Sequence, residues 1–345
     1  MGIKISICIA TLNRASYIGE TIESVIRQAT EEVEIVVLDG GSVDHTGRVV
    51  QQYQKQYPLL RYFRQDSPGG VDRDFCRAVE LAQGDYCWLM SDDDILKPGA
   101  ILAVLNEIRN DYGLIIVNAE VRSTDLSDVL DKRILPFSAN RIYGPDDSEY
   151  FFMETARFLS FIGCVVIKRS LWNEREKEKY YGTEFIHVGV IFQSRLIEDT
   201  IAIAEPYIAI RAGNAQWTSK WFEIWSFKWP KLIWSFSDFS DSAKNRVCPK
   251  EPWKKAPPML MSRALGSFSL LEYYEWIEPR PGSWLEKVRA KTIAQLPGLL
   301  VNGLGIVYFS ICCRSLSSLF YLKKSRFYYR SYLRMFFKGM PTTTG

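Results

Sequence analysis

The sequence lacks the short motifs that mark the commonest nucleotide, metal and redox sites. Neither GxGxxG nor GxxxxGK[ST] occurs, so neither a dinucleotide site nor a P-loop is indicated. There are seven cysteines, all in apolar stretches and none in a CxxC pair. An odd number without zinc-ligand spacing predicts reduced, buried thiols in a cytosolic compartment.

Charge of one sign is also scarce. The 345 residues carry a formal net charge of only +3, so we predict no nucleic-acid partner on the basis of charge. The first residues, MGIKISICIATLN, contain no charged n-region, long apolar core or small-residue cleavage site. They match a loose myristoylation pattern but fit a first buried strand better. We therefore expect no signal peptide and a cytosolic protein.

Aromatic residues, in contrast, are abundant: they make up 14% of the chain, with 10 tryptophans. This composition favours sugar stacking, contact with a membrane interface, or both.

The first ~120 residues alternate between strand and helix patterns, which is typical of an α/β fold with a mostly parallel sheet flanked by helices. Apolar runs predict strands and 3.6-residue spacing predicts helices. The predicted strands cover residues 3–10, 34–38, 60–63, 86–90 and 114–118, and a further buried strand is predicted at 160–168. The predicted helices include residues 17–26, 72–82 and 101–108.

Three consecutive aspartates, Asp92, Asp93 and Asp94, follow the predicted strand 86–90. Ligands collect at the carboxyl ends of strands in open α/β sheets, and carboxylates are the ligands that Mg²⁺ and Mn²⁺ prefer. The alternative is a helix cap, in which Asp92 or Asp93 begins the next helix. A second acid, Asp39, ends the predicted strand 34–38, where it could bind a base or a ribose or form an Asx-turn.

Three segments together resemble the nucleotide-diphospho-sugar domain of family 2 glycosyltransferases. They read SICIATLNRASYIGETIESVIRQ, EIVVLDGGSVDHT and GGVDRDFCRAVELAQGDYCWLMSDDDILKPGAI, and the likeness is greatest to the abequosyltransferase-like branch of O-antigen sugar transferases. The resemblance covers roughly the first third of the chain in order and spacing. It implies a GT-A fold and a nucleotide-sugar donor.

The resemblance also implies roles for individual residues. Asp39 matches the acid that holds the base, and Arg73 falls near a donor-binding position, although a surface helix charge is the alternative. Asp93 matches the metal-binding acid of a D-x-D motif, with Mn²⁺ or Mg²⁺ as the cofactor. The residues assigned to donor nucleotide binding are Thr11, Asn13, Arg14, Asp39, Gly41, Arg73 and Asp92. The residues assigned to the metal are Asp93, Asp94 and His187.

Two positions depart from the family pattern. Ser91 replaces the first acid of the usual L-D-x-D-D, and Gly40 replaces the second acid of D-D-G-S. Asp92 could compensate for Ser91 by contacting the ribose or the metal.

Inverting sugar transfer needs a carboxylate to accept the proton of the acceptor hydroxyl. Glu184, in YYGTEFIHVGVIF, is the first candidate and Asp199, in SRLIEDT, the second, although Asp199 also fits a helix end. His187 could bind the metal or a phosphate, or could be a hydrogen-bonded core residue. The loop residues Arg211, Asn214 and Trp217 suit diphosphate and acceptor contacts, with packing against the following helices as the alternative.

We divide the chain into a nucleotide-sugar-binding half (1–122), an acceptor-binding and catalytic half (123–215) and an aromatic-rich helical region (216–345). The apolar tract 296–313 contains Pro297, Asn302 and three glycines, so an interfacial or re-entrant segment is favoured over a spanning helix, with a buried helix as the alternative. The basic, aromatic stretch that follows suits an anionic membrane surface.

The resulting prediction is a metal-dependent glycosyltransferase on the cytoplasmic face of the inner membrane. It would transfer a sugar from a nucleotide-diphosphate donor to a lipid-linked oligosaccharide during surface polysaccharide synthesis. The alternatives are a nucleotidyltransferase and an inactive GT-A-like module that binds glycans or membranes.

Overall fold

The computed structural model describes residues 2–195 and 197–329. Its chain forms two compact units, and each is made of three separate segments. The first unit contains the residues up to Arg122, Lys132–Arg211 and Leu232–Cys248; the second contains Ser123–Asp131, Ala212–Lys231 and the chain from Pro249 onward. The segment 232–248, predicted as part of the C-terminal region, therefore belongs to the first unit.

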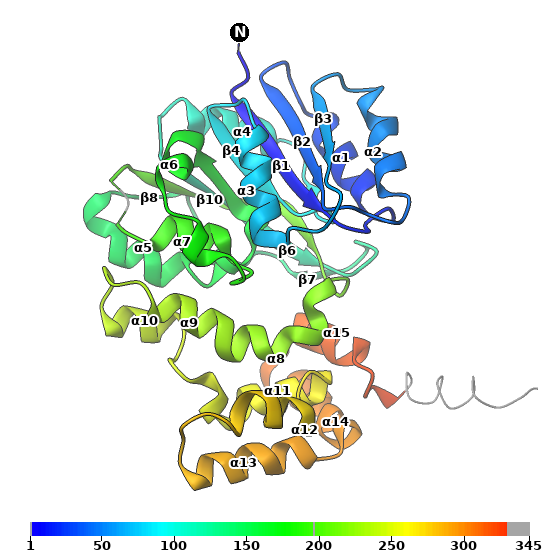
Figure 1. Cartoon of the computed structure of the whole chain (residues 1–345), viewed down its shortest axis with the longest axis vertical. Coiled ribbons are helices and arrows are strands. Elements are labelled where there is room, and N and C mark those ends of the chain that lie inside the picture. The colour runs from blue at the N-terminus through cyan, green and yellow to red at the C-terminus, as the bar shows by residue number, and fades with distance from the viewer. Residues whose placement is uncertain (1, 196, 330–345) are drawn as a thin grey trace, which may run out of the picture. The chain divides into compact units, whose positions relative to one another are not determined.

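The first unit is built on a mixed sheet with helices on both faces (Figure 1). The strand order is β3-β2-β1-β4-β9-β6-β10-β5, with β8 also paired to β10. The strands are β1 (Ile5–Thr11), β2 (Val33–Asp39), β3 (Leu60–Arg64), β4 (Tyr86–Met90), β5 (Ile95–Leu96), β6 (Leu114–Arg122), β8 (Arg141–Tyr143), β9 (Val165–Lys168) and β10 (Thr200–Arg211). Strands β3, β2, β1 and β4 are parallel, and β9 runs antiparallel between β4 and β6.

The helices of this unit cover the sheet with their apolar sides. In the helix of residues 18–26, Ile18, Ile22 and Val25 recur at helical spacing and are fully buried. Because both sheet faces are covered, β2 and β4 are buried along their whole length and read as continuous apolar runs. The helices are α1 (Ile18–Ile26), α2 (Thr46–Gln54), α3 (Val71–Leu81), α4 (Ala100–Ile108), α5 (Ser148–Thr155), α6 (Arg169–Glu174), α7 (Ile186–Phe192) and α10 (Asp241–Val247).

The strand register brings the predicted site residues to one edge of the sheet. Thr11 at the end of β1 lies beside Asp39 at the end of β2, and Asp39 lies beside Arg64 at the end of β3. On the other side of β1, Ile9 pairs with Met90, so the chain after β4 emerges at the same edge. The predicted fold class, a mixed sheet flanked by helices, is confirmed by this arrangement.

Strand β10 was not predicted. Its pairing with β6 is interrupted between Ile203 and Ile208, where Pro206 cannot donate to a ladder hydrogen bond. Asp199 directly precedes this strand, so the expectation that it ends a helix is wrong. The predicted strand at 160–168 is also shorter, because residues up to Cys164 form 3₁₀ turns before β9 begins.

The second unit contains a short strand, β7 (Val129–Asp131), and a set of helices. Its largest apolar cluster contains Phe222, Trp253, Phe268 and Ile277, all buried. The helices are α8 (Trp221–Glu223), α11 (Ala256–Leu265), α12 (Leu270–Glu272), α13 (Trp284–Gln295), α14 (Gly298–Tyr308) and α15 (Leu316–Lys324). Helix α9 (Trp229–Trp234) continues from α8 through a π-helical turn and contributes residues to both units.

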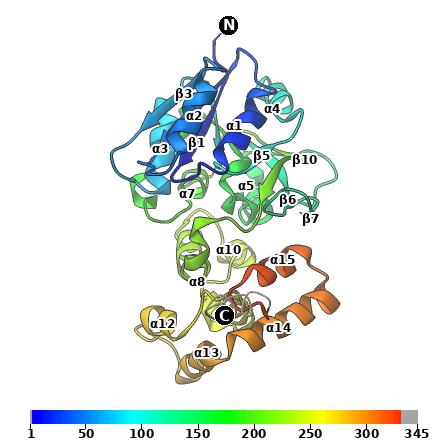
Figure 2. The same cartoon turned by 90° about the vertical axis from the view of Figure 1, so that its right-hand side faces the viewer.

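A large apolar surface in this unit remains uncovered. Helix α14 continues into a π-helical turn, Phe309–Cys313, and Figure 2 shows it following α13 along the chain. The exposed apolar side chains in this stretch are Trp284, Leu285, Val288, Leu299, Leu300, Leu304, Val307, Tyr308, Ile311 and Leu316. Cys312 and Cys313 are exposed too, so the expectation that all seven cysteines are buried is wrong for these two.

No single helix in the described ranges is long and apolar enough to cross a membrane. Trp284–Gln295 and Gly298–Cys313 pass a length-and-composition test only as a pair, and the chain bends by 94° between them.

Candidate active site

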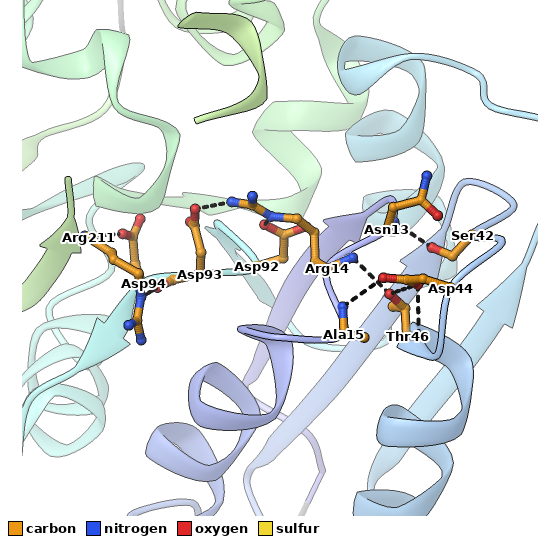
Figure 3. A network of polar contacts seen from close by, with 10 residues as sticks. All are labelled: Asn13, Arg14, Ala15, Ser42, Asp44, Thr46, Asp92, Asp93, Asp94 and Arg211. Atoms are coloured by element: carbon orange, nitrogen blue, oxygen red, sulfur yellow. Dashed lines mark hydrogen bonds and ion pairs between the residues drawn. The ribbon is translucent and has the colours of Figure 1, made fainter. Parts of the chain in front are cut away.

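The loop after β1 is fastened to the loop after β2 by hydrogen bonds (Figure 3). The amide of Asn13 donates to Ser42 Oγ (2.8 Å), and the amide of Val43 donates to Asn13 Oδ1 (2.8 Å). Asn13 has φ 55°, a left-handed conformation that asparagine tolerates better than most residues. Thr11, predicted to lie in the same nucleotide-binding turn, is buried, and its carbonyl accepts the amide of Gly40.

The backbone of Arg14 is held by the start of α2. Its amide donates to Thr46 Oγ1 (2.8 Å), and that hydroxyl in turn donates to Asp44 Oδ1 (2.5 Å). Asp44 also accepts the amide of Ala15 (3.1 Å). These bonds fix the main chain at Arg14, so its side chain leaves the loop from a defined point.

The Arg14 side chain reaches the aspartate triplet. Its Nε donates to Asp92 Oδ1 at 3.0 Å, and its Nη2 contacts Asp93 Oδ2 (Figure 3). All three side chains are at most 14% exposed. Burial lowers the pKa of Arg14, but the charges of Asp92 and Asp93 outweigh it and raise the pKa overall. Burial raises the pKa of Asp92, and the Arg14 charge opposes this rise. The Arg14 charge therefore favours the ionised form of Asp92 inside the protein.

Asp94 and Arg211 form a second pair on the other side of this segment. The Arg211 amide donates to Asp94 Oδ1 (2.8 Å), and its guanidinium donates to the Asp93 carbonyl (2.9 Å) and to Glu20 (2.5 Å). The ring of Tyr17 lies 5.0 Å from the guanidinium carbon of Arg14 and 5.2 Å from that of Arg211. Burial, together with the Asp93 charge, raises the pKa of Asp94 well above its usual value.

These contacts define the surroundings of Asp94 and Arg211, whose roles with a metal and a diphosphate stay predictions. Asp94 accepts a main-chain amide at the end of β10, so in this structure it shapes the turn around Asp93. Arg211 is buried and engaged within the first unit, although a diphosphate contact was expected of it.

Asp39 is a turn residue in this structure. Its carboxylate is fully buried and accepts the amides of Gly41 (3.1 Å) and Ser42 (2.7 Å) and the hydroxyl of Tyr62 (2.6 Å). Gly41 has φ 91°, which glycine adopts without strain, and this lets the loop fold back over the acid. The Asx-turn alternative therefore describes Asp39 in this structure, and its predicted contact with a base stays a prediction.

Arg73 lies on α3. Its guanidinium stacks 4.3 Å above the ring of Tyr181 and borders a cavity of about 440 Å³ together with Arg64 and Arg77. The apolar side chain of Phe63 also lines this cavity. Phosphate binding by Arg73 stays a prediction. A phosphate bound by Arg73 would lie in or beside this cavity, because Arg73 is one of its lining residues.

Glu184 occupies a strained position that is fixed by an acid distant in sequence. It has φ 70°, and its amide donates to Asp72 Oδ2 (3.0 Å), while the amide of Ile186 donates to Asp72 Oδ1 (3.0 Å). Burial raises the pKa of Asp72 to about 6. Left-handed backbone at a non-glycine residue is costly and is often retained where function requires it. Sequence reasoning missed Asp72 because its partners lie more than 100 residues away.

Asp199, the second candidate for the base, lies at one end of β10. Asp199 precedes the first residue of β10, whereas Arg211, which contacts Asp93 and Asp94, is its last. A strand of this length spans roughly 30 Å, so Asp199 lies at the opposite edge of the sheet. This placement separates Asp199 from the acid cluster, and a role for it as the base stays a prediction.

His187 is a core residue of α7. It is 1% exposed, and its Nε2 is 2.6 Å from the carbonyl oxygen of Leu159. Burial lowers the pKa of His187 to about 4, so the ring is neutral. A metal role for His187 is not supported by this placement, because a main-chain carbonyl occupies one ring nitrogen and the ring is closed to solvent.

The remaining predicted residues, Asn214 and Trp217, follow the unit boundary at Ala212. Asn214 is half-buried, and the side chain of Trp217 falls outside the described part of the chain. Their predicted roles with a diphosphate or an acceptor stay predictions.

The acid cluster fits a divalent cation in one respect. Asp92 and Asp93 direct carboxylate oxygens at a single cationic group, which here is the Arg14 guanidinium. Mg²⁺ and Mn²⁺ are commonly held by one or two carboxylates, with substrate phosphates and water completing the shell. Within residues 2–195 and 197–329, no group of three or more His, Cys, Asp or Glu side chains could hold a metal ion without such added ligands.

Sequence comparison relates part of this chain to known glycosyltransferases. Residues 6–169 match the family described as "Glycosyl transferase family 2". Abequosyltransferase RfbV from Salmonella typhimurium is 24% identical over 63% of this chain and 69% of its own length. GalNAc(5)-diNAcBac-PP-undecaprenol beta-1,3-glucosyltransferase from Campylobacter jejuni is 27% identical over 52% of this chain, which spans 57% of that protein.

Solved structures show the fold. TarS 1–349 of S. aureus in complex with UDP-GlcNAc has a TM-score of 0.57 at 14% identity, covering 96% of this chain and 92% of its own. The mannosyltransferase PcManGT from Pyrobaculum calidifontis, in complex with GDP-Man and Mn²⁺, has a TM-score of 0.53 at 15% identity, covering 99% and 89%. With the matched family domain, the predicted GT-A fold is confirmed, and residues 6–169 form a glycosyltransferase family 2 domain.

Proposed function

We propose that this enzyme transfers a sugar from a nucleotide-diphosphate donor to a lipid-linked oligosaccharide, with inversion, during surface polysaccharide synthesis. The observation that carries the proposal is the convergence of Asp92 and Asp93 on one cationic position at the carboxyl edge of the parallel strands. The family relationship supports sugar transfer as the reaction. Two relatives support the acceptor class: one is named for a PP-undecaprenol-linked glycan, and the other is an abequosyltransferase.

Different residues of the proposed site would act on the donor and on the acceptor. Asp92 and Asp93 would hold Mn²⁺ or Mg²⁺, and Arg14 lies where a phosphate oxygen could replace a carboxylate as its partner. The metal, when bound, supplies Lewis-acid stabilisation of the leaving diphosphate. Glu184, held beside α7 by Asp72, is the proposed base that accepts the proton of the acceptor hydroxyl.

A lipid-linked acceptor requires the enzyme to work at a membrane surface. The second unit offers an uncharged stretch from Leu296 to Cys313 that carries exposed Leu300, Leu304 and Ile311. Residues 284–329 contain seven Lys and Arg but one Glu. Apolar side chains beside cations suit an anionic bilayer, so we propose a peripheral location on the cytoplasmic face of the inner membrane.

Calorimetric titration with nucleoside diphosphates and their sugars, in Mn²⁺, Mg²⁺ or EDTA, tests the donor. Incubating the preferred nucleotide sugar with polyprenyl-diphosphate oligosaccharides then tests transfer. Metal-dependent binding of one nucleotide class, followed by sugar transfer, supports the proposal. Formation of a nucleotide sugar from a nucleoside triphosphate and a sugar phosphate would instead identify a nucleotidyltransferase. Glycan or vesicle binding with no donor binding in any metal would identify an inactive module.

A further inference from the structure

We propose that Arg14 is a built-in counter-ion that competes with the divalent cation for Asp92 and Asp93, and that a nucleoside diphosphate relieves the competition by drawing the guanidinium onto its phosphates. Nucleotide and metal then bind cooperatively because one residue of this chain changes partners. This inference rests on the proposed function, since it concerns the same donor site.

The first step in the argument is the geometry of the pair. The two carboxylates would be the protein's ligands to the metal, and each directs an oxygen at the same guanidinium, at 3.0 Å in the case of Asp92 (Figure 3). Each of these two oxygens already accepts a guanidinium N–H, which occupies one of its lone pairs and places a positive charge beside it. A divalent cation binding there must therefore displace Arg14 or share the site with a second positive charge.

The second step concerns charge and burial. Asp92, Asp93 and Arg14 are nearly closed to solvent, so repulsion between like charges is screened less than at the surface. Removing Arg14 alone would leave the two carboxylates without this partner, and removing a single partner from a buried ion pair is strongly unfavourable. Metal binding and departure of the guanidinium are therefore coupled. The metal supplies the positive charge that the two carboxylates lose when the guanidinium leaves.

The third step is the difference between the two arginines beside Tyr17. Arg211 is tied to the main chain, since its guanidinium donates to the Asp93 carbonyl and its amide donates to Asp94. The loop position of Arg14 is instead secured through its amide, by Thr46. Its side chain can thus exchange one acidic partner for another without moving the loop, and a planar guanidinium binds phosphate oxygens in pairs.

Calorimetry with MnCl₂ on the full chain tests the proposal, with and without a saturating nucleoside diphosphate drawn from UDP, GDP, CDP, ADP and dTDP. In the wild type, nucleotide should tighten Mn²⁺ binding at least tenfold. Arg14→Met, which keeps much of the apolar stem but has no charge, should bind Mn²⁺ alone about tenfold more tightly than the wild type. The further gain from nucleotide should then shrink, and by linkage Mn²⁺ should enhance nucleotide binding by the same reduced factor.

The matched control is Arg27→Met, because Arg27 is an exposed arginine at the end of α1 that pairs with Glu23. It should leave the Mn²⁺ affinity unchanged. Thermal melting with and without MnCl₂ gives an independent readout: Mn²⁺ should raise the melting temperature of Arg14→Met more than that of the wild type or the control.

Unchanged or weaker Mn²⁺ binding by folded Arg14→Met overturns the proposal. Should that variant fail to fold, Arg14→Lys provides the same test, since a compact ammonium bridges two carboxylates less well than a planar guanidinium. Arg14→Lys should bind Mn²⁺ alone more tightly than the wild type, and equal or weaker binding overturns the proposal. Failure of the proposed function looks different: no nucleotide binds and no sugar is transferred in any metal, whereas the comparison of Mn²⁺ alone still reports on Arg14.

Discussion

At the scale of single residues, the three adjacent aspartates have different environments. Asp92 and Asp93 face Arg14, while Asp94 accepts the main-chain amide of Arg211 and is buried. Their sequence order alone could not separate these environments, because each is set by an arginine that is more than 70 residues away. The aspartate triplet could be placed at a strand end from the apolar run before it, and the structure places it there.

Asp93→Asn should reduce sugar transfer by at least 100-fold, because an amide is a weaker metal ligand than a carboxylate. Asp94→Asn is the matched control, since the amide oxygen can still accept the Arg211 N–H. We expect it to retain substantially more activity than Asp93→Asn. Transfer rates and circular dichroism of both variants check this, and full activity in folded Asp93→Asn would contradict the metal assignment.

Glu184→Gln should lower kcat by about 100-fold or more, the usual scale for loss of a general base, while donor affinity changes little. Asp199→Asn is the comparison, since Asp199 lies at the far edge of the sheet and should leave kcat unaltered. Steady-state kinetics with the lipid-linked acceptor measure both. The reverse pattern, with Asp199→Asn inactive and Glu184→Gln active, would exclude Glu184 as the base.

Asp39 shows why a motif position does not fix a role. The acid at the end of a strand could bind a base or close a turn, and both options place it at the same point in the sequence. Which one holds depends on whether neighbouring donors reach it, and here Tyr62 on the adjacent strand and the amides after Gly40 do so.

At the scale of elements, hydrogen bonds join α3 to the segment that leads into α7. Asp72, near the start of α3, holds the amides of Glu184 and Ile186 on either side of the entry to α7. Apolar spacing predicted α3 because its buried face repeats locally. The link to α7 could not be predicted, since nothing in the residues around Asp72 indicates a partner so far along the chain.

This link should make stability depend on pH in a specific direction. Burial raises the pKa of Asp72 to about 6, above the unfolded value of about 3.9. Between these values the folded protein holds a proton that the unfolded chain releases, so this group's contribution to the free energy of unfolding falls as the pH rises from about 4 to 6. Asp72→Asn removes this titration. Relative to the variant, the wild type should therefore be more stable at pH 4 than at pH 7 by roughly 2 kcal/mol.

Urea unfolding at several pH values measures this difference, and Asp66→Asn, at an exposed loop carboxylate, serves as the control. Parallel pH profiles for the wild type and Asp72→Asn would show that Asp72 is not the group responsible.

Strand β10 is a second element that the sequence did not predict. Its two halves are separated by an irregular stretch containing Pro206, so neither half gave a pattern long enough to predict the whole strand.

At the scale of the whole molecule, the second unit exposes more apolar surface than water-facing helices usually do. The sequence indicated an apolar tract at 296–313, and the structure identifies which of its side chains are uncovered. Composition could not do this, because α14 is apolar on nearly all sides and its buried face is defined by packing against α11 and α15.

Leu304→Asp combined with Ile311→Asp should weaken binding to vesicles of phosphatidylglycerol and phosphatidylcholine by at least tenfold, because each substitution places a carboxylate where an apolar chain would enter the bilayer. Leu102→Asp on α4 is a matched control, being 63% exposed compared with 61% for Leu304. Vesicle co-sedimentation measures binding. Unchanged binding by the double variant would contradict the membrane role, and a wild-type dimer that the variant loses would show that a second copy covers this surface instead.

The division of each unit among separate chain segments limits how this enzyme can be recombined. The strip Ser123–Asp131 is anchored by residues encoded far downstream, since Ser317 donates to Asp131 Oδ2 (2.6 Å) and Lys324 donates to Thr124 Oγ1 (2.6 Å). During synthesis at about 5–20 residues per second, this strip waits roughly ten seconds or more for its partners. Gene fusions that exchange the C-terminal half with that of a relative would leave the strip mismatched. The rest of the second unit must therefore be inherited together with this strip, which is encoded between two segments of the first unit.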